Sequence, residues 1–360
     1  MNIGFVNFTP LVYTVETPFE KPLGGSESAL CYLSLSLAKL GHKVKLFCRV
    51  DKPKIIKKVY HFPVNKIFSK EALTDLDFLI VQNTPKYAFE IKKYLFPKTK
   101  LIFWSEHAFN QPDVSCLKNP EYLNLYDFFI FISLWQTEGF LNFFGLDKNR
   151  CFILRNAAAP FFIEKKIDLN EKREPILVYT STPFRGLDIL LEAFLLIKKK
   201  IREAKLWIFS SMKVYQQNDH QFESLYQKAG SIEGVRYFGS VSQSLLAEKL
   251  SKASIFAYPD TFPETSCIAA MEAMASGLQI VTSNLGALPE TTAGFAKLID
   301  IGQDRNLYKE KFVEEVIDCI KNQNSKETQM KLIRQMSFAK TFYNWELRAW
   351  EWEEVLKQIK

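Results

Sequence analysis

Short apolar segments alternate with stretches of helical periodicity along this chain. The first apolar segment, residues 2–7, precedes a long loop, a helical stretch at residues 28–40 and a second apolar segment at residues 43–48. Gly41 follows the helical stretch, at the place where glycine commonly ends a helix. A strand, a loop, a helix and a second strand in this order form a βαβ unit, which predicts a parallel pair of strands.

The same alternation continues through the first half of the chain. Apolar strands are expected at residues 77–82, 100–104 and 127–132, and a helix at residues 86–95. Since these strands are apolar at almost every position, both faces of the sheet are predicted to be covered by helices. Residues 156–160 (NAAAP) and the charged stretch after them signal a domain boundary.

The pattern then restarts, which predicts two successive doubly wound α/β domains. The chain ends in an amphipathic helix from Trp345 onward, whose tryptophans favour packing over ligand binding. The expected elements of the second domain are strands at residues 176–180, 205–209, 235–238, 255–258 and 279–282 and a helix at residues 186–199.

Composition and charge narrow the class of protein. The 360 residues are 47% hydrophobic and 24% charged, which is typical of a soluble globular protein of two domains. The formal net charge of +7 is uneven, because residues 1–157 carry 20 Lys and Arg against 14 Asp and Glu. No apolar run is long enough to span a membrane and the N-terminus does not resemble a signal peptide, so a cytoplasmic location is expected.

Metal sites and disulfides are not expected. The six cysteines lie far apart with no CxxC pair, and the chain has four histidines. The sequence therefore predicts reduced core thiols and no metal site.

The segment after the strand at residues 255–258 carries the most specific chemistry. Pro263 disfavours a helix interior, and the alanine-rich run after it favours a helix that begins near Thr265, with Glu264 at its entrance. Free backbone N–H groups at such a helix start favour an anion such as a phosphate. Glu272 lies eight residues beyond Glu264, or about 12 Å along a helix axis, which matches a sugar and a ribose with a diphosphate between them. On spacing alone, an ordinary helix with two exposed glutamates remains the alternative.

Several motifs together resemble one family. PETSCIAAMEAMASG at residues 263–277, followed by QIVTSNLGALPE, is similar to the E-x7-E region of the family-4 retaining glycosyltransferases. GGSE at residues 24–27, FRGLD at 184–188, GSV at 239–241 and the tryptophan-rich C-terminus resemble the same family in the same order. The resemblance runs from Met1 to about Trp352.

This resemblance implies a GT-B architecture. Two Rossmann-like domains are expected, an acceptor-side domain at residues 1–157 and a donor-binding domain at residues 158–338, with the active site in the cleft between them. A C-terminal helix within residues 339–360 is expected to cross back to the first domain.

The resemblance also implies roles for single residues. Glu264 is expected to hydrogen-bond hydroxyls of the donor sugar, Glu272 to hold the ribose hydroxyls, and Arg185 to neutralise the diphosphate. His107 matches a family histidine beside the anomeric carbon, so His107, Glu264 and Arg185 form the expected catalytic set. The other donor-binding residues are expected at the phosphates (Gly24, Gly25, and the backbone amides of Thr265 and Ser266) and at the base (Gly239, Ser240 and Val241).

The implied reaction needs no metal and no cofactor. Breaking the anomeric C–O bond places negative charge on the leaving nucleoside diphosphate, which backbone amides and Arg185 would stabilise. Members of the family retain the anomeric configuration, and the departing phosphate accepts the proton of the acceptor. Neither Glu264 nor Glu272 is then expected to act as a nucleophile or a general base.

Three features depart from the family pattern. Many relatives place an Arg and a Lys after the first strand of the second domain, whereas this chain has Arg185 there, with Lys213 after the next strand. Thr265 and Cys267 replace the usual glycines after the first glutamate, which affects how closely a phosphate can approach. The DLD sequence at residues 75–77 imitates a metal-binding DxD motif but is expected to be a solvated loop and strand cap.

The partners implied are a UDP-, GDP- or ADP-linked sugar and a glycan or lipid-linked acceptor. Lysines at residues 52–58 and 92–100 could attract a lipid diphosphate or the inner face of a membrane, or could simply form a solvated face. A nucleic-acid partner is not expected. The alternatives to a transferase are a GT-B sugar-nucleotide epimerase or phosphorylase and a catalytically silent scaffold. A Rossmann dehydrogenase is disfavoured, because no GxGxxG follows the first strand.

Overall fold

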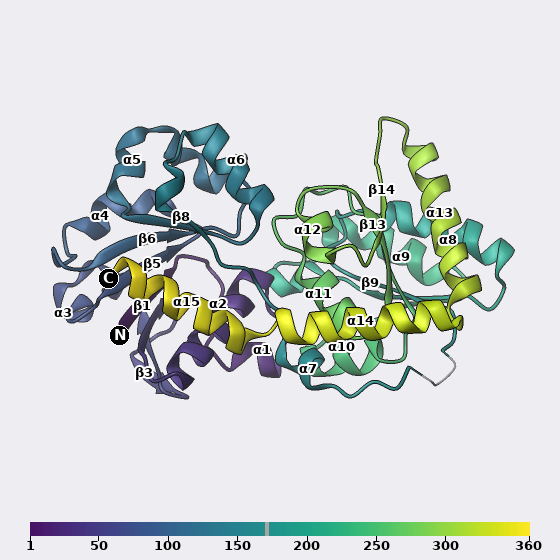
Figure 1. Ribbon diagram of the computed structural model, residues 1–360, viewed down its shortest axis with the longest axis horizontal. Helices are drawn as coiled ribbons and strands as arrows, with labels where there is room; N and C mark the ends of the chain where they lie inside the picture. Colours follow the sequence, from purple (N-terminus) through teal and green to yellow (C-terminus); the bar gives the residue numbers. More distant parts are fainter. Residues whose placement is uncertain (170–172) are drawn as a thin grey trace. The chain divides into compact units, whose positions relative to one another are not determined.

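The computed structural model describes residues 1–169 and 173–360, which divide into two compact units. Each unit is built on one β-sheet flanked by helices (Figure 1). Within the described residues, no helix is long and apolar enough to cross a membrane. Unit 1 comprises Met1–Pro18, Gly25–Asn156 and Trp345–Lys360, and unit 2 comprises Phe19–Gly24 and Ala157–Asn344.

Unit 1 contains an eight-stranded sheet of order β3-β4-β2-β1-β5-β6-β7-β8. The strands are β1 Asn2–Asn7, β2 Lys43–Cys48, β3 Lys54–Ile56, β4 Val59–Pro63, β5 Phe78–Gln82, β6 Lys100–Trp104, β7 Phe128–Phe131 and β8 Cys151–Ile153. The α-helices are α2 Gly25–Lys39, α3 Lys70–Leu73, α4 Ala88–Lys92, α5 Pro120–Leu125, α6 Leu134–Phe144 and α15 Trp345–Ile359, and the short α1 Thr17–Glu20 spans the unit boundary.

The strand order explains where ligand sites are expected in unit 1. β1 pairs in parallel with β2 on one side and β5 on the other, so the strands that follow β1 are added on one side up to β4 and on the other side from β5 onward. The carboxyl ends of strands at such a reversal form a natural binding site in open α/β sheets. β3 is antiparallel to β4, which corrects the expectation of a wholly parallel sheet: the lysine-rich segment after residue 51 forms an edge hairpin.

The C-terminal helix α15 packs within unit 1 against α2. The Trp352 ring lies 5.9 Å from Phe5 and 5.1 Å from Trp104, both in edge-on geometry. Such aromatic pairs contribute about 0.5–1.5 kcal/mol each beyond the burial of their surface. Trp345 and Trp352 therefore serve as core residues, whereas Trp350 is exposed, in agreement with the packing helix expected from the sequence.

Unit 2 contains a six-stranded sheet of order β11-β10-β9-β12-β13-β14, the order of a Rossmann fold. The strands are β9 Ile176–Thr180, β10 Lys205–Phe209, β11 Val235–Tyr237, β12 Ile255–Tyr258, β13 Gln279–Ser283 and β14 Lys297–Ile299. The α-helices are α7 Pro160–Glu164, α8 Leu187–Lys200, α9 Glu223–Ser231, α10 Gln243–Leu250, α11 Ile268–Ala275, α12 Leu288–Thr292, α13 Arg305–Asn322 and α14 Lys326–Phe342.

Helix ends in unit 2 follow from local sequence. Three helices begin at N-cap residues whose side chains accept hydrogen bonds from backbone N–H groups of the first turn. These residues are Ser242 for α10, Asp304 for α13 and Ser325 for α14. α13 packs on α8 and α14 packs on α11, so the two pairs form helical layers against the sheet (Figure 1).

The division of the chain differs in two details from the sequence-based one. The expected boundary between residues 338 and 339 falls inside α14, and the segment in unit 1 begins only at Trp345. Residues 19–24 cluster with unit 2, so Gly24 belongs to unit 2 and Gly25 to unit 1. Residues 338 and 339 lie within one continuous helix, so the boundary falls after its end and not inside it.

Candidate active site

The best-defined polar site of unit 2 lies where the order of its sheet reverses. β9 lies between β10 and β12, so the carboxyl ends of β9 and β12 flank the reversal. Arg185 follows β9, and Glu264 follows β12. The structure thus brings together two of the residues expected to be catalytic, from segments 79 residues apart.

Glu264 and Arg185 form a buried ion pair. The Arg185 Nη1 donates to Glu264 Oε1 at 2.6 Å, and the Tyr258 hydroxyl donates to the same oxygen at 2.7 Å. The Glu264 side chain is 7% exposed and that of Arg185 is 20% exposed. The Arg185 guanidinium also lies 4.5 Å from the ring centroid of Phe262, within the range of a cation–π contact. Both of these hydrogen bonds therefore end at one carboxylate oxygen, Oε1.

Two glycines allow the loops of this site to approach one another. At Gly186, which has a φ of +87°, a Cβ would lie 2.0 Å from the Pro259 carbonyl oxygen. At Gly286, which has a φ of +60°, a Cβ would lie 2.5 Å from the Glu264 carbonyl oxygen. The Ala287 N–H donates to that same carbonyl at 2.7 Å. Both positions need glycine because backbone fills the place of a side chain.

Gly286→Ala is expected to lower the free energy of unfolding by roughly 2–4 kcal/mol, because the methyl group adds a backbone clash to the strain of a positive φ. Gly294→Ala is the matched control: Gly294 has a φ of +79°, and a Cβ there meets nothing within 4 Å. The control is expected to cost about 1–2 kcal/mol. Urea unfolding of both variants measures the difference, and equal losses would contradict the proposed clash at Glu264.

The helix after Glu264 begins later than expected. α11 starts at Ile268 with Cys267 as its N-cap, so Thr265 and Ser266 lie in the preceding bend and not in the first helical turn. The two glutamates are consequently not joined by one continuous helix, and the expected axial spacing does not apply. The cause is the Cys267 backbone, whose extended φ and ψ of −82° and 91° interrupt the helical run.

Glu272 lies inside α11 with its side chain buried. Burial raises the pKa of its carboxyl to about 8, although the backbone amide of Ala159 opposes this shift. Within the described part of the chain, no group hydrogen-bonds its Oε1. A buried carboxyl oxygen without a partner is costly unless water or a ligand satisfies it. The alternative of two exposed glutamates is wrong, since Glu264 and Glu272 are both buried.

Further buried polar atoms without a partner lie along the carboxyl ends of β9, β12 and β13. Such atoms are uncommon in folded proteins, and several at one sheet edge indicate a place for a ligand or for ordered water. Among the residues described, they are Thr180 Oγ1, Thr182 Oγ1, Arg185 Nε, Asp260 Oδ2, Ser266 Oγ and Thr282 Oγ1.

Sequence reasoning missed Asp260. Its side chain is fully buried, and its Oδ1 accepts the Phe262 N–H at 2.9 Å. Burial, followed by the nearby Glu264 charge, raises the pKa of Asp260 to about 8. The buried Asp260 therefore favours its protonated form more than an exposed aspartate does, beside the Arg185–Glu264 ion pair. The signal in the sequence was the aspartate directly after a buried strand, in PDTFPE.

The residues expected at the nucleotide base lie at the same edge of the sheet. Gly239, Ser240 and Val241 are half-buried and follow β11 after one intervening residue. Lys213 is exposed in the short 3-10 helix Met212–Tyr215 beyond β10. Their roles toward a ligand stay predictions.

The other expected residues belong to unit 1. Gly25 opens α2, which begins three residues earlier than expected, immediately after Gly24. His107 follows β6, and its side chain is 30% exposed. Its Nδ1 lies 3.5 Å from Asp113 Oδ2, and burial lowers the pKa of the ring. Gly25 and His107 thus lie at the carboxyl edge of the unit 1 sheet.

The DLD motif has structural partners. Asp77 Oδ2 accepts the Asn2 N–H at 2.8 Å, and Asp77 Oδ1 lies 2.9 Å from the Lys360 ammonium. Asp75 has a φ of +64°, and its backbone carbonyl accepts a hydrogen bond from Asn2 Nδ2. Both residues precede β5, at the edge of the sheet opposite His107, and they act as a turn and a strand cap there.

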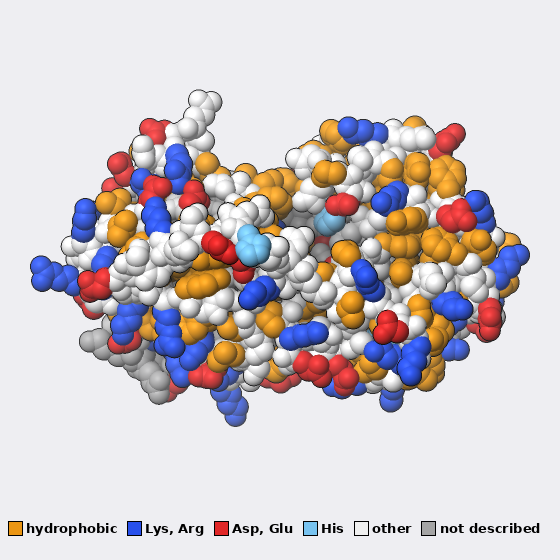
Figure 2. All heavy atoms as spheres, turned by 180° about the vertical axis from the view of Figure 1, so that it is seen from behind, with side chains coloured by type: hydrophobic (Ala, Val, Ile, Leu, Met, Phe, Trp, Pro, Cys, Tyr) orange, Lys and Arg blue, Asp and Glu red, His pale blue; other side chains and the backbone are white. Residues whose placement is uncertain are grey.

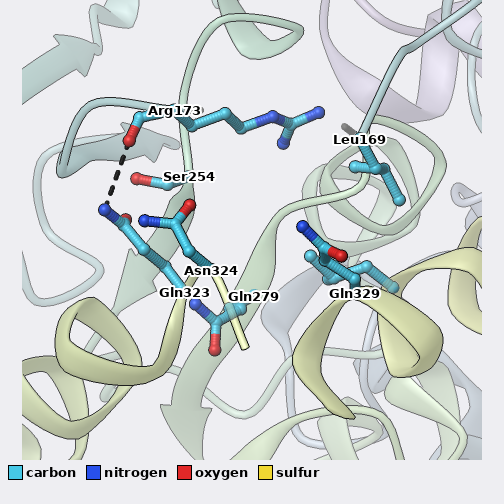
Figure 3. Close-up of a pocket in the computed structure, with 8 residues that line it drawn as sticks. Leu169, Arg173, Ser254, Gln279, Gln323, Asn324 and Gln329 are labelled. Carbon is cyan, nitrogen blue, oxygen red and sulfur yellow. Dashed lines mark hydrogen bonds between the residues drawn. The ribbon is translucent and has the colours of Figure 1, made fainter. Parts of the chain in front are cut away.

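A small cavity of about 20 Å³ lies at the amino ends of the unit 2 strands (Figure 3). Arg173 borders it and donates to the carbonyls of Ala253 and Gly277 at 3.0 and 2.7 Å. Gln323 donates to the Arg173 carbonyl at 3.2 Å, the bond drawn in Figure 3. A space of this size holds about one water. It is a structural feature at the sheet edge opposite Glu264.

The chain is similar to known glycosyltransferases in sequence and in fold. The family model described as "Glycosyl transferases group 1" matches residues 161–336. A glycosyltransferase from Rickettsia africae ESF-5 has a TM-score of 0.74 at 15% identity, over 99% of this chain and 98% of that chain. HepE from Anabaena in complex with UDP-glucose has a TM-score of 0.73 at 15% identity, over 99% of this chain and 100% of that one.

A third similar structure is WaaG, a glycosyltransferase involved in lipopolysaccharide biosynthesis, with a TM-score of 0.68 at 15% identity over 99% of both chains. No curated protein matches the sequence. At such identities the structures establish a shared fold, whereas the family match covers the part of unit 2 that holds Arg185, Glu264 and Glu272. Residues 161–336 therefore belong to the glycosyl transferases group 1, and the chain is a glycosyltransferase with the GT-B fold.

Proposed function

We propose that this chain is a retaining transferase that moves a hexose-type sugar from a nucleoside-diphosphate sugar to a glycan or glycolipid acceptor. The observation that carries the proposal is the Arg185–Glu264 pair at the reversal of the unit 2 sheet, with the buried Glu272 in the helix that follows. A similar structure, HepE, is in complex with UDP-glucose, which makes UDP-sugars the first donors to test.

In the proposed reaction, the bond between the anomeric carbon and the diphosphate oxygen breaks while the acceptor oxygen bonds to that carbon. The acceptor proton passes to the departing phosphate, as the family resemblance implies. Arg185 stabilises the negative charge that develops on the diphosphate, and such preorganised groups contribute most where water is excluded. The free oxygen of Glu264 accepts from a hydroxyl of the donor sugar and so orients the ring.

Thermal shift with UDP-, GDP- and ADP-sugars tests the donor class. A ligand at 100 times its Kd stabilises the folded protein by about 2.7 kcal/mol, which raises the Tm by several degrees. Product analysis with and without a glycan acceptor then separates the alternatives. Binding without turnover indicates a silent scaffold, and a changed sugar nucleotide without an acceptor indicates an epimerase. No shift with any sugar nucleotide would contradict the proposal.

Transfer is expected to be independent of divalent metal, because Arg185 and backbone amides supply the positive charge at the diphosphate. Turnover with the donor found by thermal shift should be the same, within twofold, in buffer with EDTA and in buffer with manganese. Loss of turnover in EDTA and its recovery with manganese would contradict this expectation. Asp77→Asn then tests whether the DLD motif is involved.

The acceptor is proposed to bind to unit 1 and to carry negative charge. The β3–β4 hairpin turns at Lys57 and Lys58, both with positive φ, and its Ile55 is 63% exposed. Two lysines at a tight turn beside an exposed apolar side chain suit a lipid phosphate or an anionic membrane surface. Elsewhere, Lys and Arg are interspersed with Asp and Glu on the face shown in Figure 2. The attraction is therefore assigned to the hairpin and not to a uniformly basic surface.

A further inference from the structure

A chain of buried amides at the reversal of the unit 1 sheet leads to Glu106. The Thr9 N–H donates to Asn7 Oδ1 at 2.9 Å, and Asn7 Nδ2 donates to Gln82 Oε1 at 2.6 Å. Gln82 Nε2 then donates to the Ser26 carbonyl at 3.0 Å and to Glu106 Oε1 at 3.2 Å. Asn7 ends β1 and Gln82 ends β5, so the chain of hydrogen bonds crosses the reversal itself.

The hydrogen bonds determine which way the side-chain amides of Asn7 and Gln82 are turned. A backbone N–H can only donate, so Asn7 must present its oxygen to Thr9 and its nitrogen to Gln82. Gln82 therefore presents its oxygen to Asn7 and its nitrogen to Glu106. The second Glu106 oxygen accepts from Asn156 Nδ2 at 3.3 Å. Both carboxylate oxygens thus face donors, which is the arrangement of an ionised carboxylate.

The same residue fixes the loop that carries His107. The Glu106 N–H donates to Asn83 Oδ1 at 2.7 Å, and Asn83 has a φ of +60°. Gln136 Nε2 donates to the carbonyls of Ser105 and His107 at 2.9 and 2.7 Å. The backbone at residues 105–107 is therefore held on both sides, and Glu106 links it to the start of α2 at Ser26.

Burial brings the ionisation of Glu106 into the neutral range. The pKa of Glu106 is raised to about 7 by burial and by the buried Glu27 of α2, whereas hydrogen bonds from Asn156, Ser26 and Gln82 oppose the shift. Burial also raises the pKa of Glu27. His107, the next residue, titrates below its ordinary range.

We propose that Glu106 is a positioning residue whose ionised carboxylate holds the His107 loop against the start of α2. Protonation at the second oxygen would turn the Asn156 amide, because an O–H group cannot face the Asn156 nitrogen. The oxygen of that amide has no partner among the residues described and is free to accept. Turnover therefore declines as the pH falls through about 7. The kinetic test of this inference rests on the proposed transfer reaction, whereas the structural part of the inference does not.

Glu106→Gln tests the proposal, since glutamine resembles the protonated carboxyl in shape and hydrogen bonding. The variant is expected to keep the Tm of the wild type and to show a kcat roughly ten- to hundredfold lower at pH 8, with a flat profile from pH 5.5 to 8.5. Glu138→Gln, at an exposed position of α6, is the matched control and should keep the wild-type profile. KM for the donor should be unchanged in both.

A second measurement does not depend on turnover. The NMR signal of the His107 ring, assigned with His107→Gln, should show an inflection near pH 7 in the wild type and in Glu138→Gln but not in Glu106→Gln. Absence of transfer by the wild type would count against the proposed function. The His107 titration would then decide the role of Glu106 by itself. An unchanged pH profile and an unchanged His107 titration in Glu106→Gln would overturn the inference. A fall in Tm with no change in either profile would show a merely structural role and overturn it equally.

Discussion

Replacing Glu264 with alanine is expected to lower kcat by about 100- to 1,000-fold, the usual range for loss of one preorganised group at the developing charge. The carboxylate holds Arg185 at 2.6 Å and offers its second oxygen to the donor sugar. Its loss removes the contact that fixes the guanidinium, which then keeps its stacking on Phe262 as an orienting contact but loses its charged partner. Turnover under saturating donor measures the effect.

Tyr258→Phe is the matched control for Glu264. It removes a hydrogen bond of 2.7 Å to the same carboxylate oxygen but leaves the charge and the Arg185 contact in place. We expect a loss of about tenfold, which corresponds to the lower end of the range for one hydrogen bond to a charged group, about 1.5 kcal/mol. Donor Kd should change little in either variant. Wild-type turnover in Glu264→Ala, or a Kd that rises as much as kcat falls, would contradict the assignment of Glu264 to orientation of the sugar and of Arg185.

Glu272→Ala is expected to weaken donor binding by about 100-fold, the equivalent of two hydrogen bonds to hydroxyls in a buried site. With a pKa of about 8, the carboxyl is mostly protonated at neutral pH, so it can donate one hydrogen bond and accept another from a ribose diol. Glu272→Gln keeps one donor and one acceptor and should stay within about tenfold of the wild type. Isothermal titration with the sugar nucleotide provides the Kd.

Stability separates this effect from a folding defect. Removal of the carboxyl relieves the desolvation cost of the unpartnered Oε1 within the described part of the chain but also deprives the Ala159 amide of its acceptor, so the Tm should fall by no more than about a few degrees. Glu314→Ala, an exposed glutamate of α13, is the control for loss of a glutamate in unit 2. Equal Kd values for Glu272→Ala and the control would refute a ribose-binding role.

Much of the fold could be predicted because its strands are fully buried. The apolar segments at residues 2–7, 43–48, 100–104, 176–180 and 205–209 are strands with the same bounds in the structure. Such runs have few alternatives once helices cover both faces of the sheet. β3 and β4 escaped prediction because an edge hairpin with lysines at its turn has no continuous apolar pattern.

The candidate site was only partly predictable. Motif order pointed to Arg185, Glu264 and Glu272, and the structure places the first two in direct contact. The start of α11 was placed too early, since helix propensity does not register that the Cys267 backbone is extended. Asp260, Tyr258 and the Gln82–Glu106 bond could not be predicted, because their roles depend on burial and on side-chain contacts that the pattern of residue types does not show.

The sequence by itself determined the two α/β units, the strands of their cores and the family to which residues 161–336 belong, because these depend on local periodicity and on motif order. Only the tertiary structure decided which side chains share a site and in which state. Burial removes water from Glu264, Glu272, Asp260 and Glu106. The groups that compensate these carboxyls include Arg185 for Glu264 and Gln82 for Glu106, which come from other segments of the chain. Desolvation and hydrogen bonding determine the ionisation of such groups, and the local pattern of residues predicts neither of them.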